Sequence, residues 1–188
     1  MSTPTTSELT LANATGTWVI DAAHTSLGFS ARHAMVAKVR GTFGEFSGSF
    51  TIDGANLAAS SAELTIQAAS IDTKNADRDG HLKSPDFLDV ENFGTITFVS
   101  TAVKVDGSDV VVTGDLTIHG VTKSVDVAYE FVGISQDPWG NTKIGFEGST
   151  KISRKEFGLV WNATLETGGV LVGDDIKLNL DVEATKQA

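Results

Sequence analysis

Apolar and polar residues alternate with a period of two over most of this chain, and this pattern constrains the fold more than any other feature. In residues 109–120, "DVVVTGDLTIHG", the apolar Val110, Val112, Leu116 and Ile118 share one parity. Successive side chains of a strand point to opposite faces, so the pattern predicts strands with one buried and one solvated face. Further strands are expected at 17–21, 24–33, 38–52, 60–69, 94–105, 123–132, 142–153 and 175–183.

The connections between these stretches favour antiparallel pairing. "VDGSD" at 105–109, "HGVTK" at 119–123 and "DPWGN" at 137–141 are short and place glycine in the tight part of the turn. Several strands exceed the usual length of about 5 to 6 residues. Long strands with one apolar face must close on themselves or leave an aggregation-prone edge. We therefore expect an all-β fold, an extended antiparallel β-barrel of about eight strands, whose interior is either filled by side chains or open to a ligand.

Two segments interrupt the alternation. Residues 75–83, "NADRDGHLK", predict a short helix capped by Thr73 or Asn75, and 154–161, "RKEFGLVW", predicts a bent connection. The barrel should thus carry one or two short helices. We expect a flexible N-terminal segment over 1–15, rich in Thr, Ser and Ala, and a single domain over 16–185.

Composition excludes several classes of function. The net charge of −10 disfavours long-range attraction to nucleic acid or to an anionic membrane, although a local basic pocket could still bind one anionic group. The absence of cysteine excludes disulfides, thiolate nucleophiles and sulfur-ligated zinc. No stretch is apolar enough for a membrane span, and the N-terminus lacks the pattern of a secretory signal. We expect a soluble, cytoplasmic protein without stable membrane insertion.

The most polar stretch of the chain is "DRDGHLKSPDF" at 77–87. On a helix, Arg78 and His81 share one face, and so do Asp79 and Lys83. One interpretation is a solvated helix surface with a weak ion pair. The other is a polar lip at one end of the barrel, where Arg78 and His81 meet the charged head of a ligand.

Metal and hydrolase sites find little support in the sequence. His24, His33, His81 and His119 are scattered without the spacing of a metal site, so no metal is expected. No GxSxG motif is present, which disfavours a serine hydrolase. His24, Arg32 or His33 could lie near the barrel mouth. Asp115 and His119 could form a hydrogen-bond network on one face of a strand.

Several strings of the sequence resemble the YceI-like family of polyisoprenoid-binding proteins. They are "GTWVIDAAHTSLGFSARH", "VRGTFGEFSGSF", "SIDTKNADRDGHLKSPDFLDVENFGTITFVS", "VTGDLTIHGVTKSVDV" and "ISRKEFGLVWN". The motifs within them are D-x-x-H-[ST], Thr-x4-RDxHL-x-SxxF, GDLTIHGVTK and R-x-x-FG-x-x-W. The resemblance covers about residues 16 to 184.

This resemblance implies a lipocalin-like barrel with a long apolar tunnel that holds a polyisoprenoid or a related long amphiphile, its polar head near the mouth. It implies no cofactor beyond such a lipid and no catalytic residue. For the head group we select His24, Arg78, His81, His119 and Lys123. For the tunnel wall we select Leu27, Phe29, Val39, Phe43, Phe46, Leu64, Ile66, Ile96, Phe98, Leu116, Ile118, Val127, Tyr129, Phe131, Ile144, Phe146, Trp161, Ile176, Leu178 and Leu180.

Two other functions stay open at this point. The chain could be an enzyme acting on a prenyl phosphate, with His81 or His119 and Asp79 or Asp115 as acid and base. It could also be a structural or stress-related protein without a ligand. The expected partners are a long-chain isoprenoid or fatty ligand and optionally a second copy in a homodimer, but no nucleic acid.

Overall fold

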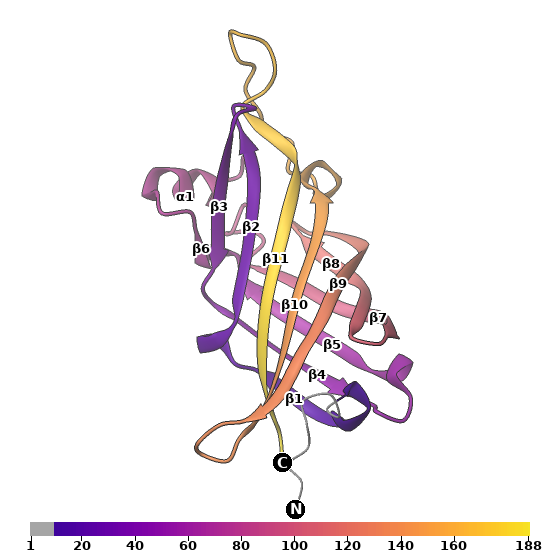
Figure 1. Cartoon of the computed structure of the whole chain (residues 1–188). Helices are drawn as coiled ribbons and strands as arrows, with labels where there is room; N and C mark the ends of the chain where they lie inside the picture. The colour runs from indigo at the N-terminus through magenta and orange to yellow at the C-terminus, as the bar shows by residue number, and fades with distance from the viewer. Residues whose placement is uncertain (1–9) are drawn as a thin grey trace, which may run out of the picture.

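Antiparallel strands wind into a barrel in the structure, a computed structural model that describes residues 10–188 (Figure 1). The strands are β1 Gly16–Ile20, β2 Ser26–His33, β3 Ala37–Phe43, β4 Phe46–Ile52, β5 Ser61–Gln67, β6 Ile71–Asp72, β7 Thr95–Asp106, β8 Asp109–Ile118, β9 Val121–Gln136, β10 Thr142–Ser153 and β11 Val172–Lys186. Within residues 10–188 the one α-helix is α1, Ala76–Lys83, and the 3-10 turns are η2 Leu11–Asn13, η3 Ala22–His24, η4 Leu57–Ala59, η5 Ala68–Ser70 and η6 Arg154–Phe157.

Three pairs of these strands are halves of longer, bent segments. β11 pairs with β2 along one part of its length and with β1 along another. In the same way, β4 pairs with β1 and β5, while β3 pairs with β2 and β6. Joining β1 to β2, β3 to β4 and β5 to β6 leaves eight segments, each hydrogen-bonded to the next along the chain.

The first segment also pairs with the last, and this closes the barrel. Trp18 lies opposite Lys186 and Ile20 opposite Ala184. The predicted all-β, lipocalin-like barrel of about eight antiparallel strands is therefore confirmed, and α1 is the helix predicted at 75–83. Asn75 is its N-cap and accepts a hydrogen bond from the backbone N–H of Arg78 at 2.9 Å.

The bends were not predicted as such. The stretch 38–52 was expected as one strand, but it breaks at Gly44 and Glu45, where the chain passes from β3 to β4. The stretch expected to begin at 24 starts at Ser26, because Asp21 caps the 3-10 turn η3 by accepting a hydrogen bond from Ala23 N–H. Each bend lets one segment pair with different neighbours at its two ends.

Two apolar clusters occupy the two ends of the barrel. We call the end that carries α1 and η6 the mouth and the end that carries η2 and the C-terminus the base (Figure 1). The mouth cluster centres on Phe157, Ile118 and Leu159, and the base cluster centres on Trp18, Ile144 and Ala184.

The N-terminal segment was expected to be flexible over 1–15. Residues 1–9 lie outside the described part of the chain. In 10–15, Leu11 and Ala14 are buried in the base cluster, and Trp18 Nε1 donates a hydrogen bond to Ala14 O at 2.9 Å. These residues are therefore packed against the base, which corrects the expectation for this part of the segment.

No helix in residues 10–188 combines the length and the apolar character needed to cross a membrane.

Candidate functional site

Two apolar cavities lie inside the barrel, one toward each end. The cavity nearer the base has a volume of about 190 Å³ and the cavity nearer the mouth about 290 Å³. Six residues line both cavities, and we call them the waist: Leu27, Ile66, Ile96, Leu116, Leu178 and Leu180. The interior is therefore open space with apolar walls and not a continuous plug of side chains.

Glycines on the walls help to keep this space open. A Cβ at Gly148 would lie 2.3 Å from the ring of Tyr129, and a Cβ at Gly114 would lie 2.4 Å from the ring of Phe98. A Cβ at Gly41 would likewise lie 2.4 Å from the ring of Phe29, its partner in the strand register. Each ring thus lies flat over a glycine of the neighbouring strand, as aromatic residues do when they cover a strand glycine.

Most of the residues selected for the tunnel wall line one or both cavities; the exceptions are Phe46, Phe131 and Ile144. Phe131 and Ile144 belong to the base cluster, but they do not reach either cavity. Phe46 is the first residue of β4, directly after the bend, and is partly exposed. Period-two alternation assigns a face of the sheet, but it does not tell how far the cavity extends along the barrel.

The mouth cavity is lined by several basic side chains and by no carboxylate. Arg32, His33, Arg78, His81 and Arg154 all contribute to its wall, whereas no Asp or Glu of residues 10–188 does. In a chain of net charge −10, this distribution is unusual. An anionic group at the mouth would be electrostatically favoured there.

Thr73 connects the strand end before α1 to two residues of the helix. Its backbone N–H and hydroxyl donate to Asp79 Oδ1, while Arg78 Nε and Nη2 donate to the Thr73 hydroxyl and carbonyl at 2.7 Å each. This arrangement explains the spacing in Thr-x4-RD. It also holds the Arg78 guanidinium at the cavity wall. The ion pair predicted between Asp79 and Lys83 does not form, because Asp79 accepts hydrogen bonds from Thr73 instead.

His81 stands between two aromatic rings at the mouth. Its ring packs edge-on against Trp161, with centroids 4.6 Å apart, and against Phe87 at 5.0 Å. Its Nε2 lies 2.9 Å from Asp86 Oδ2. The RDxHL-x-SxxF motif thereby presents an imidazole whose orientation is fixed from three sides.

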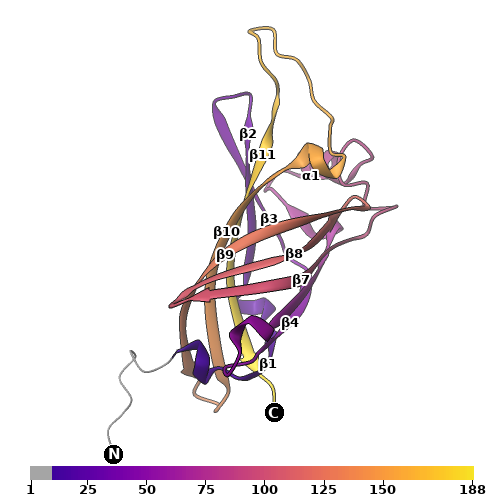
Figure 2. The same ribbon diagram turned by 90° about the vertical axis from the view of Figure 1, so that its right-hand side faces the viewer.

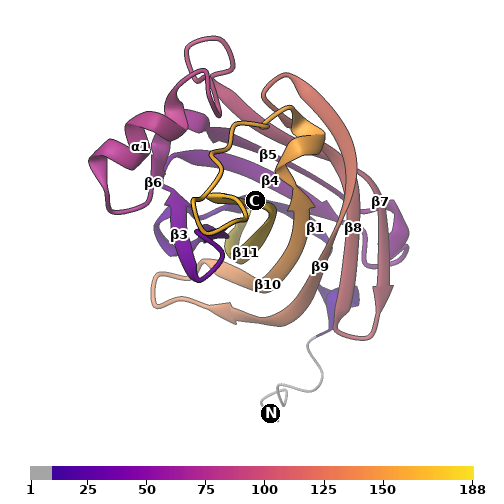
Figure 3. The ribbon, with the colours of Figure 1, turned by 90° about the horizontal axis from the view of Figure 1, so that it is seen from above.

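A long segment that begins within the bent connection expected at 154–161 crosses the mouth. Seen from above, residues 158–171 run over the barrel opening between η6 and β11 (Figure 3). Arg154 binds this segment from below: Nη1 donates to the carbonyls of Leu159 and Trp161 at 2.6 and 2.9 Å, and Nε donates to Gly173 O at 2.9 Å. Its pKa is lowered by burial, an effect that Asp174 opposes, yet a guanidinium stays protonated at any ordinary pH.

Sequence reasoning did not select Arg154, Phe157 or Leu171 as functional residues. The signal was present in the R-x-x-FG-x-x-W motif. Phe157 is fully buried in the mouth cluster, Gly158 adopts the left-handed conformation with φ of 78° that ends η6, and Trp161 lines the cavity. The motif therefore builds the closure of the mouth.

Tyr129 supplies a hydroxyl to the cavity nearer the base. Burial raises its pKa to about 12, so the hydroxyl stays neutral. Among residues 10–188 this hydroxyl forms no hydrogen bond, and burial is the only cause of its pKa shift. It is available to a ligand.

The five residues selected for the head group do not gather in one place. Arg78 and His81 line the mouth cavity, whereas His24, His119 and Lys123 line neither cavity. Lys123 is exposed, and His119 lies in the tight turn between β8 and β9, where its ring packs on Phe93. These three positions correct the sequence-based selection, because parity and turn geometry direct the side chains away from the lumen.

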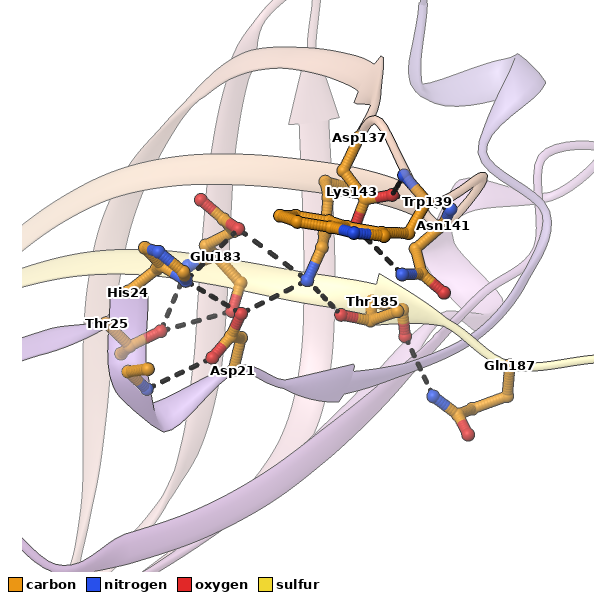
Figure 4. Close-up of polar contacts among 11 residues, drawn as sticks. Asp21, His24, Thr25, Asp137, Trp139, Asn141, Lys143, Glu183, Thr185 and Gln187 are labelled. Carbon is orange, nitrogen blue, oxygen red and sulfur yellow. Dashed lines mark hydrogen bonds and ion pairs between the residues drawn. The ribbon is translucent and has the colours of Figure 1, made fainter.

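His24 instead belongs to a polar group on the outer side of the barrel near the base, which we call the seam cluster: Asp21, His24, Lys143 and Glu183 (Figure 4). Lys143 Nζ lies 3.1 Å from Asp21 Oδ2, and His24 Nδ1 lies 2.9 Å from the same oxygen. Thr25 Oγ1 adds hydrogen bonds to the backbone of Glu183. The cluster joins the first bent segment to β10 and β11, where the barrel closes.

The seam cluster brings together three groups that can bind metals, Asp21, His24 and Glu183, which the sequence did not predict. The Lys143 ammonium lies within 4 Å of both carboxylates and already balances their charge. A divalent cation would have to displace it. We interpret the cluster as an ion-pair network at the closure.

Replacing Asp21 with asparagine should reveal a stability contribution that depends on pH. Hydrogen bonds from His24 and Lys143 lower the Asp21 pKa from 3.8 to about 2, so its contribution is present above pH 3.8 and is lost as the pH falls toward 2. The His24 pKa is raised above 6.5, chiefly by its hydrogen bond to Asp21, so its contribution is lost as the pH rises through that raised value. Near pH 5 we expect the free energy of unfolding of D21N to be about 1 kcal/mol lower than that of the wild type. The loss is small because solvent screens the charges of this partly solvated site.

Urea unfolding from pH 2.5 to 8.5 measures this difference. Asp175→Asn is the matched control, since the Lys151–Asp175 pair has a similar distance of 3.3 Å but is exposed on both sides. Equal losses in the two variants, or a loss for Asp21→Asn that does not change with pH, would contradict the expectation.

Known proteins share both the sequence pattern and the fold. The YceI-like domain profile matches residues 18–184. Protein YceI of Escherichia coli is 42% identical over 164 residues, which cover 87% of this chain and 83% of that protein. The crystal structure of the Campylobacter jejuni YCEI protein is similar with a TM-score of 0.69 and 32% identity, covering 84% of this chain and 90% of that one.

A more distant structure agrees in fold alone. It is described as a polyisoprenoid binding domain from Saccharophagus degradans implicated in plant cell wall breakdown. Its TM-score is 0.69 at 16% identity, and the match covers 90% of this chain and 98% of that one.

Proposed function

Because the chain belongs to the YceI-like family, we propose that it binds and carries a polyisoprenoid or a similar long-chain amphiphile, with the apolar chain inside the barrel and an anionic head at the mouth. The observation that carries this proposal is the pair of apolar cavities that meet at the waist. The polyisoprenoid binding described for the Saccharophagus degradans domain supports the same class of ligand.

The size and lining of the cavities suit such a ligand. Small-molecule sites are typically concave and mostly apolar, with a few polar groups that fix orientation. Each methylene removed from water contributes roughly 0.8 kcal/mol, from which the cost of ordering the chain must be subtracted. A branched prenyl chain that fills both cavities would thus be bound by its apolar part, without any specific polar contact along the walls.

The head group is the part of the ligand that the mouth can select. Arg78 is oriented by Thr73, and the carboxylate-free wall of the mouth cavity favours a negative head over a neutral one. A charge-assisted hydrogen bond from a guanidinium to a phosphate is roughly twice as strong as a neutral one.

Geranylgeranyl phosphate and geranylgeraniol have the same chain and differ in head charge, so comparing them tests the proposal. We expect delipidated protein to bind both, and to bind the phosphate more tightly by about tenfold, as one charged hydrogen bond of about 1.5 kcal/mol would produce. Arg78→Gln should remove most of that preference while binding of the alcohol is retained. Isothermal titration and native mass spectrometry of the complex measure both.

Lys123→Gln is the matched control, because it removes the same charge from an exposed position outside both cavities. The absence of binding for both lipids would refute the proposal. If Arg78→Gln and Lys123→Gln change the preference for the phosphate equally, the mouth does not select the head group, although the protein still binds the lipid chain.

We do not propose catalysis on a prenyl phosphate, because the acid–base pairs that such an enzyme was expected to use are not formed. Asp79 is engaged by Thr73, and the carboxylate beside His81 is Asp86. Asp115 is exposed on β8, and the ring contact of His119 is with Phe93.

A further inference from the structure

The hairpin between β2 and β3 projects from the mouth end of the barrel together with the loop that leads into β11 (Figures 1 and 2). Its tip consists of Ala34, Met35 and Val36, and the last two are 62% and 83% exposed. Exposed apolar side chains at the tip of a hairpin contribute nothing to the core. Their place at the end of the molecule suits contact with another surface.

This tip is held in place. Ala34 N–H donates to Leu171 O at 2.8 Å, which joins the hairpin to the neighbouring loop. Met35 also packs closely against Gly169. A Cβ added at Gly169 would lie only 2.4 Å from Met35 Sδ, so no larger residue would fit there without a shift. Contacts with the neighbouring loop therefore hold the hairpin tip, including the exposed Val36, at the edge of the mouth.

The stem of the hairpin is basic. Arg32, Lys38 and Arg40 lie on it, and the chain has no Asp or Glu between Asp21 and Glu45. Ala31 and Val39 line the mouth cavity, so alternation places Lys38 and Arg40 on the outer face of the strands; Arg32 is also exposed, and it reaches the wall of the mouth cavity as well. None of the three forms an ion pair within residues 10–188.

Two of these cations face each other. Arg32 and Lys38 are direct partners in the antiparallel register, an arrangement of like charges that destabilises a strand pair. The fold gains nothing from it, whereas an anionic surface would be attracted by both charges at once. The carboxylates at the start of β11 are engaged elsewhere, Asp174 by Lys155 and Asp175 by Lys151.

We propose that the β2–β3 tip docks the mouth of the barrel onto an anionic phospholipid membrane, with Met35 and Val36 in the interface and Arg32 and Lys38 facing the lipid phosphates. Interfacial elements bury apolar side chains about 5 to 10 Å into the headgroup boundary. At about 3.3 Å per residue, both cations lie about 10 Å from the tip, within about one Debye length of the surface.

Docking in this orientation brings the mouth of the cavity to the bilayer. It goes beyond the proposed lipid binding and does not rest on it, because Met35, Val36 and Lys38 line neither cavity. The net charge of −10 opposes long-range attraction, so the interaction is local and should be sensitive to salt.

The absence of cysteine makes the test direct, since a single introduced cysteine carries the only label. Val36→Cys, labelled with an environment-sensitive fluorophore, is titrated with vesicles of phosphatidylglycerol and phosphatidylcholine and with vesicles of phosphatidylcholine alone. We expect a blue shift with the anionic vesicles that is lost at high salt, and a much smaller shift with the neutral ones. Trp139→Cys is the matched control, because Trp139 is 84% exposed on the hairpin at the opposite end.

Flotation of unlabelled protein with the same vesicles provides a second measurement. The double variant Arg32→Gln and Lys38→Gln should bind about 30-fold more weakly, given about 1 kcal/mol for each cation near an anionic surface. Lys104→Gln, an exposed lysine on β7, should have no effect. Glu166→Gln should strengthen binding, because Glu166 is an exposed carboxylate in the loop beside the tip.

Three results would overturn the proposal. One is the absence of a shift at position 36 with anionic vesicles. Another is an equal shift at position 139, which would place the contact at the base. The third is a shift at position 36 that grows with protein concentration without vesicles, since this would identify a second copy of the chain as the partner. Lipid titrations on the same samples report ligand binding separately, so each proposal can fail alone.

Discussion

Replacing Arg154 with methionine is expected to lower the melting temperature by roughly 6 to 12 °C. The guanidinium is only 3% exposed and donates hydrogen bonds to the carbonyls of Leu159, Trp161, Val172 and Gly173. Methionine fills similar space without donors, so the carbonyls would be left unpaired or would have to turn to water. Leaving buried polar groups unpaired costs about 1 to 3 kcal/mol each, and we expect a total loss near 3 kcal/mol because the segment can partly relax. For a chain of this size each kcal/mol corresponds to about 2 to 4 °C.

Lys155→Met is the matched control for Arg154→Met. Both side chains approach Asp174, Arg154 Nη2 at 3.6 Å and Lys155 Nζ at 3.3 Å, but Lys155 is 51% exposed. We expect a change below about 1 kcal/mol for an exposed pair of this kind. Hydrogen exchange should show faster exchange over residues 158–173 for Arg154→Met alone. Similar melting temperatures for the two variants would show that the buried hydrogen bonds do not hold the mouth segment.

The sequence motif contained Arg154, but its role could not be predicted from it. The carbonyls that Arg154 binds belong to the backbone of a segment without regular structure, and sequence patterns do not specify the path of such a segment. By contrast, strand identity follows from local alternation, which is why β8 and β10 lie close to their predicted bounds.

The bends were harder to predict for the same reason. The segment of β3 and β4 remains extended on both sides of Gly44 and Glu45, so its residues read as one strand. The break becomes visible only when the partners are known, since β3 pairs with β2 and β4 pairs with β1. Closure of the barrel is a global constraint, and local sequence carries little information about it.

The same contrast applies to the candidate site. Alternation selected most residues of the cavity walls, because facing inward is a local property of a strand. The head-group candidates were selected by residue type, and type alone could not separate Arg78 and His81, which lie at the mouth, from His24, which lies in the seam cluster. The i,i+3 spacing on a helix was the informative signal, since it placed Arg78 and His81 on one face.

Replacing Leu116 with tryptophan is expected to abolish lipid binding, by at least about a hundredfold, while leaving the fold intact. Leu116 is a waist residue of β8 and lines both cavities, so a larger ring there would separate them. Overpacking a well-filled core costs about 1 to 3 kcal/mol, but here the added ring would enter open space and fill part of it. Stability should therefore change by less than about 1 kcal/mol. Titration with geranylgeraniol measures the loss of chain binding without any contribution from a charged head.

Val99→Trp is the control that makes this result specific. Val99 lies opposite Asp115, the residue before Leu116, in the register between β7 and β8, and it is 53% exposed on the outer face. It therefore adds the same indole beside the waist but outside the lumen, and lipid binding should be unchanged. If Leu116→Trp binds geranylgeraniol as tightly as Val99→Trp while both remain folded, the lipid does not pass the waist. In that case the mouth cavity of about 290 Å³ would have to hold the chain alone, which limits the ligand to a shorter amphiphile than the proposed function requires.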